Sequence, residues 1–209
     1  DDIYSKEDIR NCIKHRYSIL ATKAKNQLNA SERITRSQLS NFGVVLEKNG
    51  ILADFVEKPK KFVSDTVSTA FYSLDREIFK YVKQIKKSKR NELELPDAIK
   101  LLSKNQKIHV IRSRKWLPIV YAFDLLNADK ILRKKKNIFG KNSKILGDVE
   151  NSSVGNNCVI KGTVKDSIIM DKSVIEKNSL IKNSVIGEKT HIDGKIYNSI
   201  VSDNVKIKN

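Results

Sequence analysis

Apolar positions in the first two thirds of the chain follow two spacings. The runs YSILATK, FGVVLE, ILADFVE, TAFYSL and KIHVIRS are short and rich in β-branched and aromatic residues, which predicts strands. Apolar residues recur three or four positions apart in SKEDIRNCIKH, DREIFKYVKQI, LPDAIKLLSK and FDLLNADKILRKKK, which predicts helices. This alternation indicates a mixed α/β domain from residue 1 to about residue 136.

The start of the first predicted helix carries a capping signal. Ser5 and Asp8 have the spacing of a capping box, and Ile9, Cys12 and Ile13 are expected on its buried face.

Two connections are also marked by their composition. Asn49-Gly50, between FGVVLE and ILADFVE, predicts a tight hairpin turn. The polar stretch NQLNASERITRSQLSN, residues 26–41, predicts a loop or lid.

From about residue 137 to residue 209 the spacing of apolar residues becomes six. Ile169, Ile175 and Ile181 follow one another at this interval, which recurs from Ile186 to Ile192. Pairs of serine and an aliphatic residue recur, with Gly, Asn and Asp between them. This pattern predicts a left-handed parallel β-helix of four coils, in which three hexads close each coil, serines fit the corners and Asn adopts left-handed backbone angles. An antiparallel meander gives no reason for a period of six.

Composition limits the class of protein. With 39% hydrophobic and 31% charged residues the chain can build a core, and its longest apolar runs are far shorter than the roughly 20 residues that cross a bilayer. The polar start DDIYSKEDIR does not resemble a signal peptide. Cys12 and Cys158 lie far apart without metal-ligand spacing. We expect a cytoplasmic protein with no membrane partner, two inert thiols and no zinc site.

The net charge of +17 raises the question of an anionic partner. Lysines outnumber arginines by 32 to 9, and aromatic residues do not alternate with them as a base-stacking surface requires. A solvated, lysine-rich surface is therefore favoured over specific nucleic-acid binding.

The segment FVEKP places Glu57, Lys58 and Pro59 directly after a predicted strand. Charges at such a position are ordinarily loop charges. The alternative is that they form one end of a binding site.

The order GVV…FVEKP…TAFYSL…NELELPDAI…KWLPIVYAFDLLNADKIL, followed by hexapeptide repeats, resembles the sugar-phosphate nucleotidylyltransferases. It looks most like the archaeal-type, two-domain members related to glucose-1-phosphate thymidylyltransferase and N-acetylglucosamine-1-phosphate uridylyltransferase. The resemblance implies a Rossmann-like domain, here incomplete, that joins a sugar 1-phosphate to a nucleoside triphosphate and releases pyrophosphate. It also implies homo-oligomers formed through the β-helix.

The resemblance also implies site residues. Gly43 would let a sugar hydroxyl approach the backbone, Glu57 would accept from sugar hydroxyls, and Lys58 would bind the sugar phosphate and act in catalysis. The rest of the sugar site would come from a stretch in which Ser and Ala replace the family's usual Asn and Gly: Ser68, Thr69 and Tyr72. Asn91 and Glu92 match a family segment with a structural role. Asp1 corresponds to the carboxylate that holds Mg²⁺ in the family.

Two features depart from the family pattern. No Gly-rich phosphate loop occurs in the 209 residues, so we expect a C-terminal portion of a longer enzyme, inactive alone. Pro118 stands where the family has a second metal-binding Asp, and Asp124 is expected to cap the last helix.

Two alternatives remain open. The chain could be a regulatory or assembly subunit that senses sugar phosphates without catalysis. It could also be a hexapeptide-repeat acyltransferase with His191 as general base, although a surface role for this histidine is favoured. His15 and His109 are expected to have no paired partner.

Overall fold

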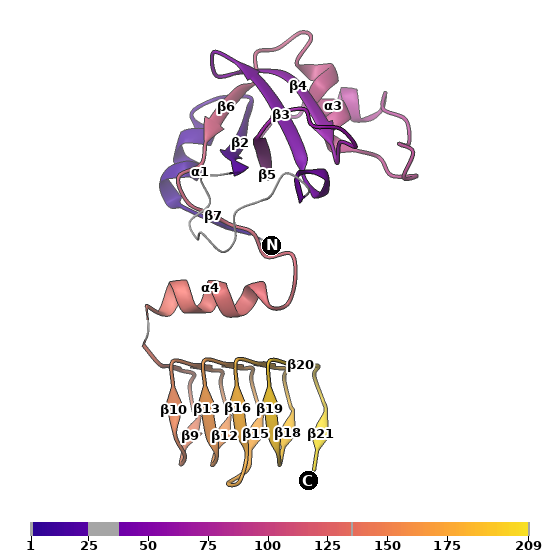
Figure 1. Ribbon diagram of the computed structural model, residues 1–209. Helices are drawn as coiled ribbons and strands as arrows, with labels where there is room; N and C mark the ends of the chain where they lie inside the picture. Colours follow the sequence, from indigo (N-terminus) through magenta and orange to yellow (C-terminus); the bar gives the residue numbers. More distant parts are fainter. Residues whose placement is uncertain (1, 25–37, 135, 209) are drawn as a thin grey trace. The chain divides into compact units, whose positions relative to one another are not determined.

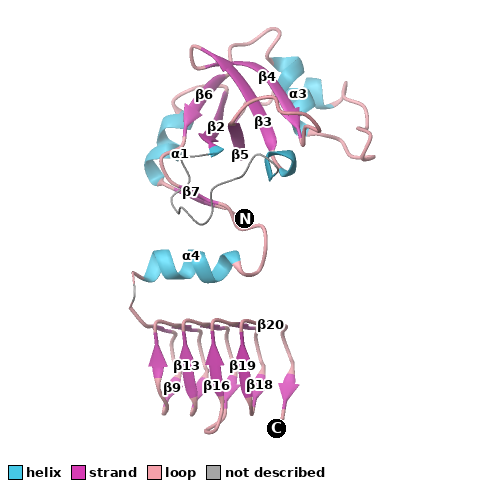
Figure 2. Cartoon of the chain, viewed as in Figure 1, coloured by secondary structure: helices cyan, strands magenta, loops and turns pink. Residues whose placement is uncertain are grey.

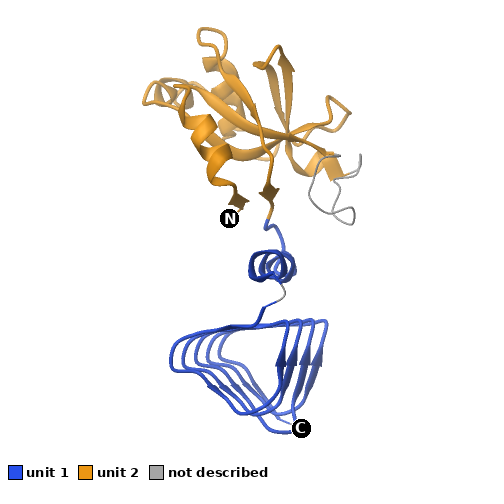
Figure 3. Ribbon diagram, turned by 90° about the vertical axis from the view of Figure 1, so that its left-hand side faces the viewer, with its two compact units in different colours: residues 1, 119–209 blue, residues 2–118 orange. Residues whose placement is uncertain are grey.

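The computed structural model describes residues 2–24, 38–134 and 136–208 (Figures 1 and 2). The chain forms two compact units, one of residues 2–118 and one that begins at residue 119 (Figure 3). No helix among the described residues is long and apolar enough to cross a membrane.

The first unit contains the strands and helices that the apolar spacing predicts, and it adds the two-residue strands β1 and β7, which pair antiparallel. Its elements are β1 (Ile3–Tyr4), α1 (Lys6–Ile13), β2 (Ser18–Lys23), the 3-10 helix η3 (Gln38–Asn41), β3 (Gly43–Lys48), β4 (Ile51–Glu57), β5 (Thr66–Ser73), α2 (Ile78–Val82), α3 (Leu95–Leu102), β6 (His109–Arg112) and β7 (Trp116–Leu117). The remainder of the predicted loop or lid lies outside the described residues.

Five strands form one sheet that closes on itself in the order β2-β5-β3-β4-β6. The β2–β6 pair is parallel and the other pairs are antiparallel. The predicted hairpin joins β3 to β4: Asn49 and Gly50 have φ angles of 52° and 74°, as a two-residue hairpin turn requires.

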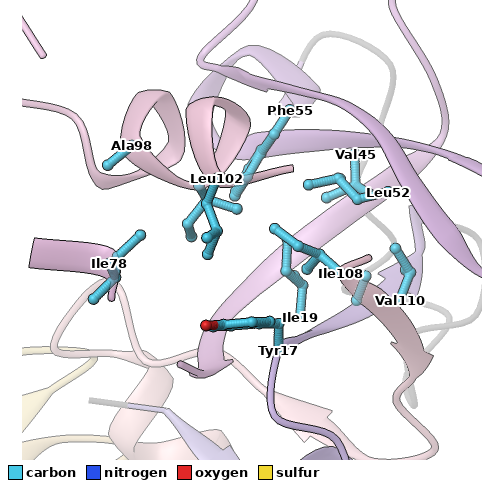
Figure 4. Packing of buried hydrophobic residues seen from close by; sticks show 12 residues of the cluster. Tyr17, Ile19, Val45, Leu52, Phe55, Ile78, Ala98, Leu102, Ile108 and Val110 are labelled. Carbon is cyan, nitrogen blue, oxygen red and sulfur yellow. The ribbon is translucent and has the colours of Figure 1, made fainter. Parts of the chain in front are cut away.

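The main core of this unit lies between the sheet and helices α2 and α3 (Figure 4). Ile19 lies on β2 and Ile108 directly precedes β6, the two strands of the parallel pair. Ile99 and Leu102 lie on α3. All four are fully buried. Each such side chain contributes about 1.5–3 kcal/mol through burial, so the packing of α3 on the sheet is a major source of stability.

Only half of the predicted capping box forms at α1. The Ser5 hydroxyl accepts from the Asp8 backbone N–H at 3.0 Å, as predicted. The Asp8 carboxylate is fully buried and instead accepts from the Ser113 hydroxyl and the backbone N–H groups of Arg114 and Lys115. Ile13, expected on the buried face, is 63% exposed. The reason is that Asp8 takes a buried position by pairing with the segment after β6.

The second unit contains helix α4 and a parallel β-helix, which confirms the predicted change of fold. Figure 3 shows the triangular outline of its coils. Three parallel sheets contain five, five and four strands, in the orders β20-β17-β14-β11-β8, β21-β18-β15-β12-β9 and β10-β13-β16-β19. The elements are α4 (Asp124–Arg133), β8 (Ile138–Phe139), β9 (Lys144–Ile145), β10 (Val149–Glu150), β11 (Ser153–Val154), β12 (Val159–Ile160), β13 (Thr163–Lys165), β14 (Ile168–Ile169), β15 (Val174–Ile175), β16 (Leu180–Lys182), β17 (Val185–Ile186), β18 (His191–Ile192), β19 (Lys195–Tyr197), β20 (Ile200–Val201) and β21 (Lys206–Ile207).

The coils are shorter than three hexads, so that prediction was wrong, and the five-strand sheets show more than the expected four coils. Ser153 pairs with Ile138 and Ile168, each fifteen residues away, whereas Ile168 pairs with Val185 seventeen residues later. The buried aliphatic residues are therefore not all six apart: Val164 follows Ile160 by four. The six-residue interval is real but marks only some sides of the triangle.

Serines lie at the corners, as predicted, and they also form a ladder of hydrogen bonds between coils. The Ser167 backbone N–H donates to the Ser152 hydroxyl, and the Ser184 backbone N–H donates to the Ser167 hydroxyl. Asn142, Asn157 and other turn residues have positive φ, which confirms the predicted left-handed turns. Each coil thus satisfies polar groups of the next.

Helix α4 is fixed to the β-helix through Asp129. Its carboxylate accepts from the Ser153 hydroxyl and from Nε of Arg133 at 2.6 Å, and the Arg133 side chain is only 3% exposed. Asp124 is the first residue of α4, and its carboxylate accepts from the backbone N–H groups of Val120 and Tyr121. It therefore closes the preceding turn rather than capping the helix from the N-cap position.

Candidate functional site

Gly43 and Glu57 face each other across the β3–β4 pair. A Cβ atom added at Gly43 would lie 2.7 Å from Glu57 Oε2 and 2.8 Å from the ring of Phe55. The glycine is therefore required for the Glu57 carboxylate to lie against the β3 backbone. A ligand hydroxyl that reaches this carboxylate would also lie next to the β3 main chain.

Lys58 follows the last residue of β4 in a left-handed backbone conformation, with φ of 44°. Its backbone N–H donates to the carbonyl of Phe42 at 3.1 Å, which continues the β3–β4 pairing by one residue. A non-glycine residue in the left-handed conformation costs about 1 kcal/mol, so the backbone at Lys58 is strained where the chain leaves β4.

Strand β5 contains a bulge opposite Leu20. The β2–β5 register shifts between Ile19 and Ala21, and Ala70 within the bulge has a φ of 58°. The bulge brings the Ser68 hydroxyl within 3.2 Å of the Tyr72 hydroxyl and 3.2 Å of the Ala70 backbone N–H. Bulges commonly re-aim side chains beside binding sites, and this one pairs two hydroxyls.

Side chains of β4 and β5 lie close together here, because the ring centroid of Phe55 on β4 is 6.2 Å from that of Tyr72 on β5. Burial raises the pKa of Tyr72 to about 12, with the Glu57 charge adding to the effect. Burial also raises the pKa of Glu57 above its usual range, while Arg90 and Lys58 oppose that rise. Gly43, Glu57 and Tyr72 thus form one neighbourhood with hydroxyl and carboxylate groups.

Thr69 is separate from these groups. It is fully buried, its hydroxyl donates to the carbonyl of Leu20 at 3.0 Å, and its own carbonyl accepts from the Tyr4 hydroxyl. Its side chain is therefore engaged in the fold rather than presented to a ligand.

Arg90, which the sequence did not single out, reaches this neighbourhood from the loop before α3. Its Nη2 lies 2.7 Å from Glu94 Oε1, 3.1 Å from Glu92 Oε2 and 3.9 Å from Glu57 Oε1. Its place in the KRNELE segment, next to residues matched to the family, was the available signal.

The metal position stays a prediction, because Asp1 lies outside the described residues. Its neighbour Asp2 accepts from Nε1 of Trp116 at 2.8 Å and contacts the Tyr4 hydroxyl. Among the residues that the structure describes, no three His, Cys, Asp or Glu side chains are grouped to hold a metal ion.

The histidines differ from expectation in one respect. His15 and His109, expected to have no partner, stack on each other with ring centroids 3.9 Å apart, because they precede and open the adjacent parallel strands β2 and β6. His191 is a partly exposed residue on the outside of the β-helix, and its Nε2 lies 3.0 Å from Glu176 Oε1. Cys12 and Cys158 are free, and burial raises the pKa of both thiols.

Comparisons with known proteins agree with this architecture. Residues 1–135 match the family model described as nucleotidyl transferase, and residues 135–209 match the model described as GlmU-like, C-terminal hexapeptide. The bifunctional protein GlmU of Methanocaldococcus jannaschii is 32% identical over 166 residues, which cover 78% of this chain and 35% of that protein. A bifunctional sugar-1-phosphate nucleotidylyltransferase/acetyltransferase of Sulfurisphaera tokodaii is 32% identical over 155 residues, covering 73% and 36%.

Among solved structures, a putative glucose-1-phosphate thymidylyltransferase from Bacillus anthracis in complex with a sucrose is 24% identical, with a TM-score of 0.47, and covers 65% of this chain and 53% of that one. This chain spans about a third of the length of the two archaeal relatives. The nucleotidyl transferase match covers well over half of the chain. The chain therefore belongs to the nucleotidyl transferase family and carries a GlmU-like hexapeptide region at its C-terminal end.

Proposed function

We propose that the protein transfers a nucleotidyl group from a nucleoside triphosphate to a sugar 1-phosphate, and that Glu57 and Lys58 hold the sugar phosphate. The observation that carries this proposal is the Glu57 carboxylate lying against Gly43 with Lys58 adjacent in the chain. Family membership and the printed activity of the Sulfurisphaera relative support it.

The proposed roles follow from the geometry. Glu57 accepts hydrogen bonds from sugar hydroxyls, and Gly43 leaves room for the Glu57 carboxylate to lie beside the β3 backbone. Lys58 binds the phosphate as a point charge. The Ser68 and Tyr72 hydroxyls offer donors and acceptors beside the sugar. Thr69, carried over from the family pattern, contributes to the site by fixing the bulge.

In the proposed reaction, a phosphate oxygen of the sugar 1-phosphate attacks the α-phosphorus of the triphosphate. The new P–O bond forms as the bond from the α-phosphorus to the bridging oxygen breaks, and pyrophosphate leaves with that electron pair. The contribution of this chain is to position the attacking phosphate and to neutralise its charge with Lys58. No Gly-rich phosphate loop occurs in the 209 residues, so the residues named here account for the sugar-phosphate half of the reaction.

Mg²⁺ is the proposed cofactor, and Asp1 is its proposed ligand. When bound, the ion would supply charge compensation for the phosphates. The described residues do not provide a ligand set, and Pro118, at the family's second metal position, has no side-chain donor.

Binding of a sugar 1-phosphate tests the site. In the full-length protein encoded by the gene, Lys58→Ala should weaken binding measured by calorimetry at least about tenfold, which corresponds to about 1.4 kcal/mol. Lys60→Ala, which removes an exposed lysine two residues later, is the matched control and should leave binding unchanged. Equal affinity of Lys58→Ala and wild type would rule out this placement.

A regulatory or assembly subunit that senses sugar phosphates is the competing function. It predicts the same binding but no pyrophosphate release from any nucleoside triphosphate and sugar 1-phosphate pair. A coupled pyrophosphate assay on the full-length protein separates the two functions.

Acyl transfer by the hexapeptide region is a second candidate activity. The His191–Glu176 contact favours it, because a carboxylate that orients one imidazole nitrogen leaves the other to act as a base. Lys161 also contacts Glu176, as expected of a surface ion-pair ladder. Loss of acetyl transfer in His191→Ala, with nucleotidyl transfer retained, would support this activity.

We also propose that copies of the chain associate through the β-helix and that the protein is cytoplasmic. Ile138 and Phe139 are exposed large hydrophobic residues at the first coil, and neither cysteine forms a disulfide. Light scattering on the full-length protein tests the first statement.

A further inference from the structure

The loop between α2 and α3 is folded so that it presents one arginine in a fixed place. The Ser88 backbone N–H donates to the carbonyl of Glu92 at 2.8 Å, and the Asn91 N–H donates to the carbonyl of Ser88 at 2.9 Å. The Arg90 N–H donates to the Ser88 hydroxyl at 3.1 Å, and Asn91 closes the turn with a φ of 63°. These bonds fix the backbone that carries the Arg90 side chain.

The Arg90 guanidinium lies among three carboxylates. Its Nη2 donates a charge-assisted hydrogen bond to Glu94 Oε1 at 2.7 Å and forms an ion pair with Glu92 Oε2 at 3.1 Å. Glu57 Oε1 is 3.9 Å away, which is an ion-pair distance but too long for a hydrogen bond. The Arg90 side chain is therefore held by Glu92 and Glu94, and it acts on Glu57 through its charge.

We propose that Arg90 is a positioning residue that keeps the Glu57 carboxylate beside Gly43 ionised by compensating the nearby charges of Glu92 and Glu94. The structural part of this proposal concerns Glu57 alone. Its consequence for sugar-phosphate binding rests on the proposed function.

The charge balance around Glu57 explains why such a residue is needed. Among the residues that the structure describes, the groups that act on Glu57 are Arg90, Glu92 and Glu94 from the loop, Lys58 from its own strand end, and Tyr72 from β5. Burial and the two neighbouring carboxylates favour the protonated form of Glu57, and Arg90 and Lys58 favour the ionised form. Glu94 is different: burial would raise its pKa, but hydrogen bonds from Ser88 and Arg90 outweigh this and lower it.

Removal of Arg90 would leave Glu57 partly buried beside two carboxylates, with Lys58 as the remaining facing cation in the described part of the chain. Its pKa would rise, so Glu57 would take up a proton at a higher pH than in the wild type. A protonated Glu57 accepts fewer and weaker hydrogen bonds from hydroxyls. As the pH is lowered, ligand binding that requires the ionised Glu57 carboxylate would therefore be lost at a higher pH without Arg90 than in the wild type.

The direct test follows the Glu57 carboxyl carbon by ¹³C NMR in protein labelled at glutamate side chains, with the signal assigned from Glu57→Gln. In Arg90→Gln the titration midpoint of Glu57 should rise by about one pH unit, and Arg90→Lys should restore most of the difference. Lys89→Gln, which removes the neighbouring exposed lysine, is the matched control and should leave the midpoint unchanged.

A second variant tests the same balance with the opposite sign and does not depend on the folding of Arg90→Gln. Glu92→Gln removes an exposed carboxylate and should lower the Glu57 midpoint. An unchanged midpoint in both Arg90→Gln and Glu92→Gln would overturn the proposal.

Calorimetry with a sugar 1-phosphate separates this inference from the proposed function. If the wild type binds, Arg90→Gln should lose more affinity at about pH 5 than at about pH 8. If the wild type does not bind but the Glu57 midpoint shifts as expected, the proposed function fails and the positioning role of Arg90 stands. If the wild type binds and the midpoint does not shift, the positioning role fails.

Discussion

Gly43 lies so close to Glu57 that any side chain at position 43 would displace the carboxylate, since an added Cβ atom would be 2.7 Å from Oε2. We predict that Gly43→Ala weakens sugar 1-phosphate binding at least about tenfold, and that it destabilises the protein by about 1–3 kcal/mol because Phe55 must also move. Calorimetry and urea denaturation measure the two effects.

The control for this change is Gly50→Ala in the hairpin turn. Gly50 has a φ of 74° and an added Cβ meets nothing within 4 Å. It should lose about 1 kcal/mol of stability with unchanged binding. Equal loss of binding in both variants would mean that Gly43 acts through stability alone.

The bulge in β5 gives a prediction of increased stability. Ala70 has a left-handed backbone, which costs alanine about 1 kcal/mol but costs glycine little. Ala70→Gly should therefore raise the free energy of unfolding by up to about 1 kcal/mol, as measured by urea denaturation. Ala53→Gly, at an exposed position in β4, should instead lower it by about 0.5–1 kcal/mol. Destabilisation by both changes would contradict this interpretation of the bulge.

The Asp129–Arg133 pair predicts unequal effects of removing its two members. Asp129→Ala leaves a guanidinium that is only 3% exposed without its carboxylate, which costs about 3–5 kcal/mol. Arg133→Met removes the buried charge itself and should cost clearly less. Thermal unfolding followed by circular dichroism measures both variants. A larger loss in Arg133→Met than in Asp129→Ala would show that packing, not charge, holds α4.

Asp75 predicts a pH-dependent contribution to stability. Its carboxylate accepts from the Glu77 backbone N–H, which is the main cause of its lowered pKa, and also from Arg16 and Tyr17. A lowered pKa means stabilisation that is complete above the unfolded value near 3.8 and is lost as the pH falls through the folded value. The difference in Tm between wild type and Asp75→Asn should be largest near neutral pH and shrink below about pH 4. A constant difference from about pH 3 to pH 7 would refute this.

Local pattern predicted the elements but not the contacts between distant residues. The Asn49-Gly50 turn, the helices and the change to a β-helix depend on neighbouring residues, and each was predicted correctly. The Asp8 carboxylate accepts a hydrogen bond from Ser113, 105 residues later in the sequence, and the residues next to Asp8 give no indication of that partner. The fifteen-residue coils were missed because the interval from Ile160 to Val164 departs from the six-residue period.

The candidate site was predictable only as far as the resemblance extended. Glu57 and Lys58 were proposed from their motif, whereas the charge environment of Glu57 depends on Arg90, whose loop conformation is set by hydrogen bonds from Ser88 and Asn91. Thr69 matched the motif, yet its hydroxyl is consumed by the fold, because a bulge turns alternate side chains in ways that a sequence interval does not reveal.

The serine ladder joins each coil of the β-helix only to its immediate neighbours, so the coils behave as interchangeable modules. Excision or duplication of one whole fifteen-residue module would bring chemically equivalent corners together and leave the inner stack continuous. Gain or loss of a single residue would instead put a polar side chain where an aliphatic one belongs. Evolution can thus lengthen or shorten the β-helix by whole coils while the remaining coils keep their packing.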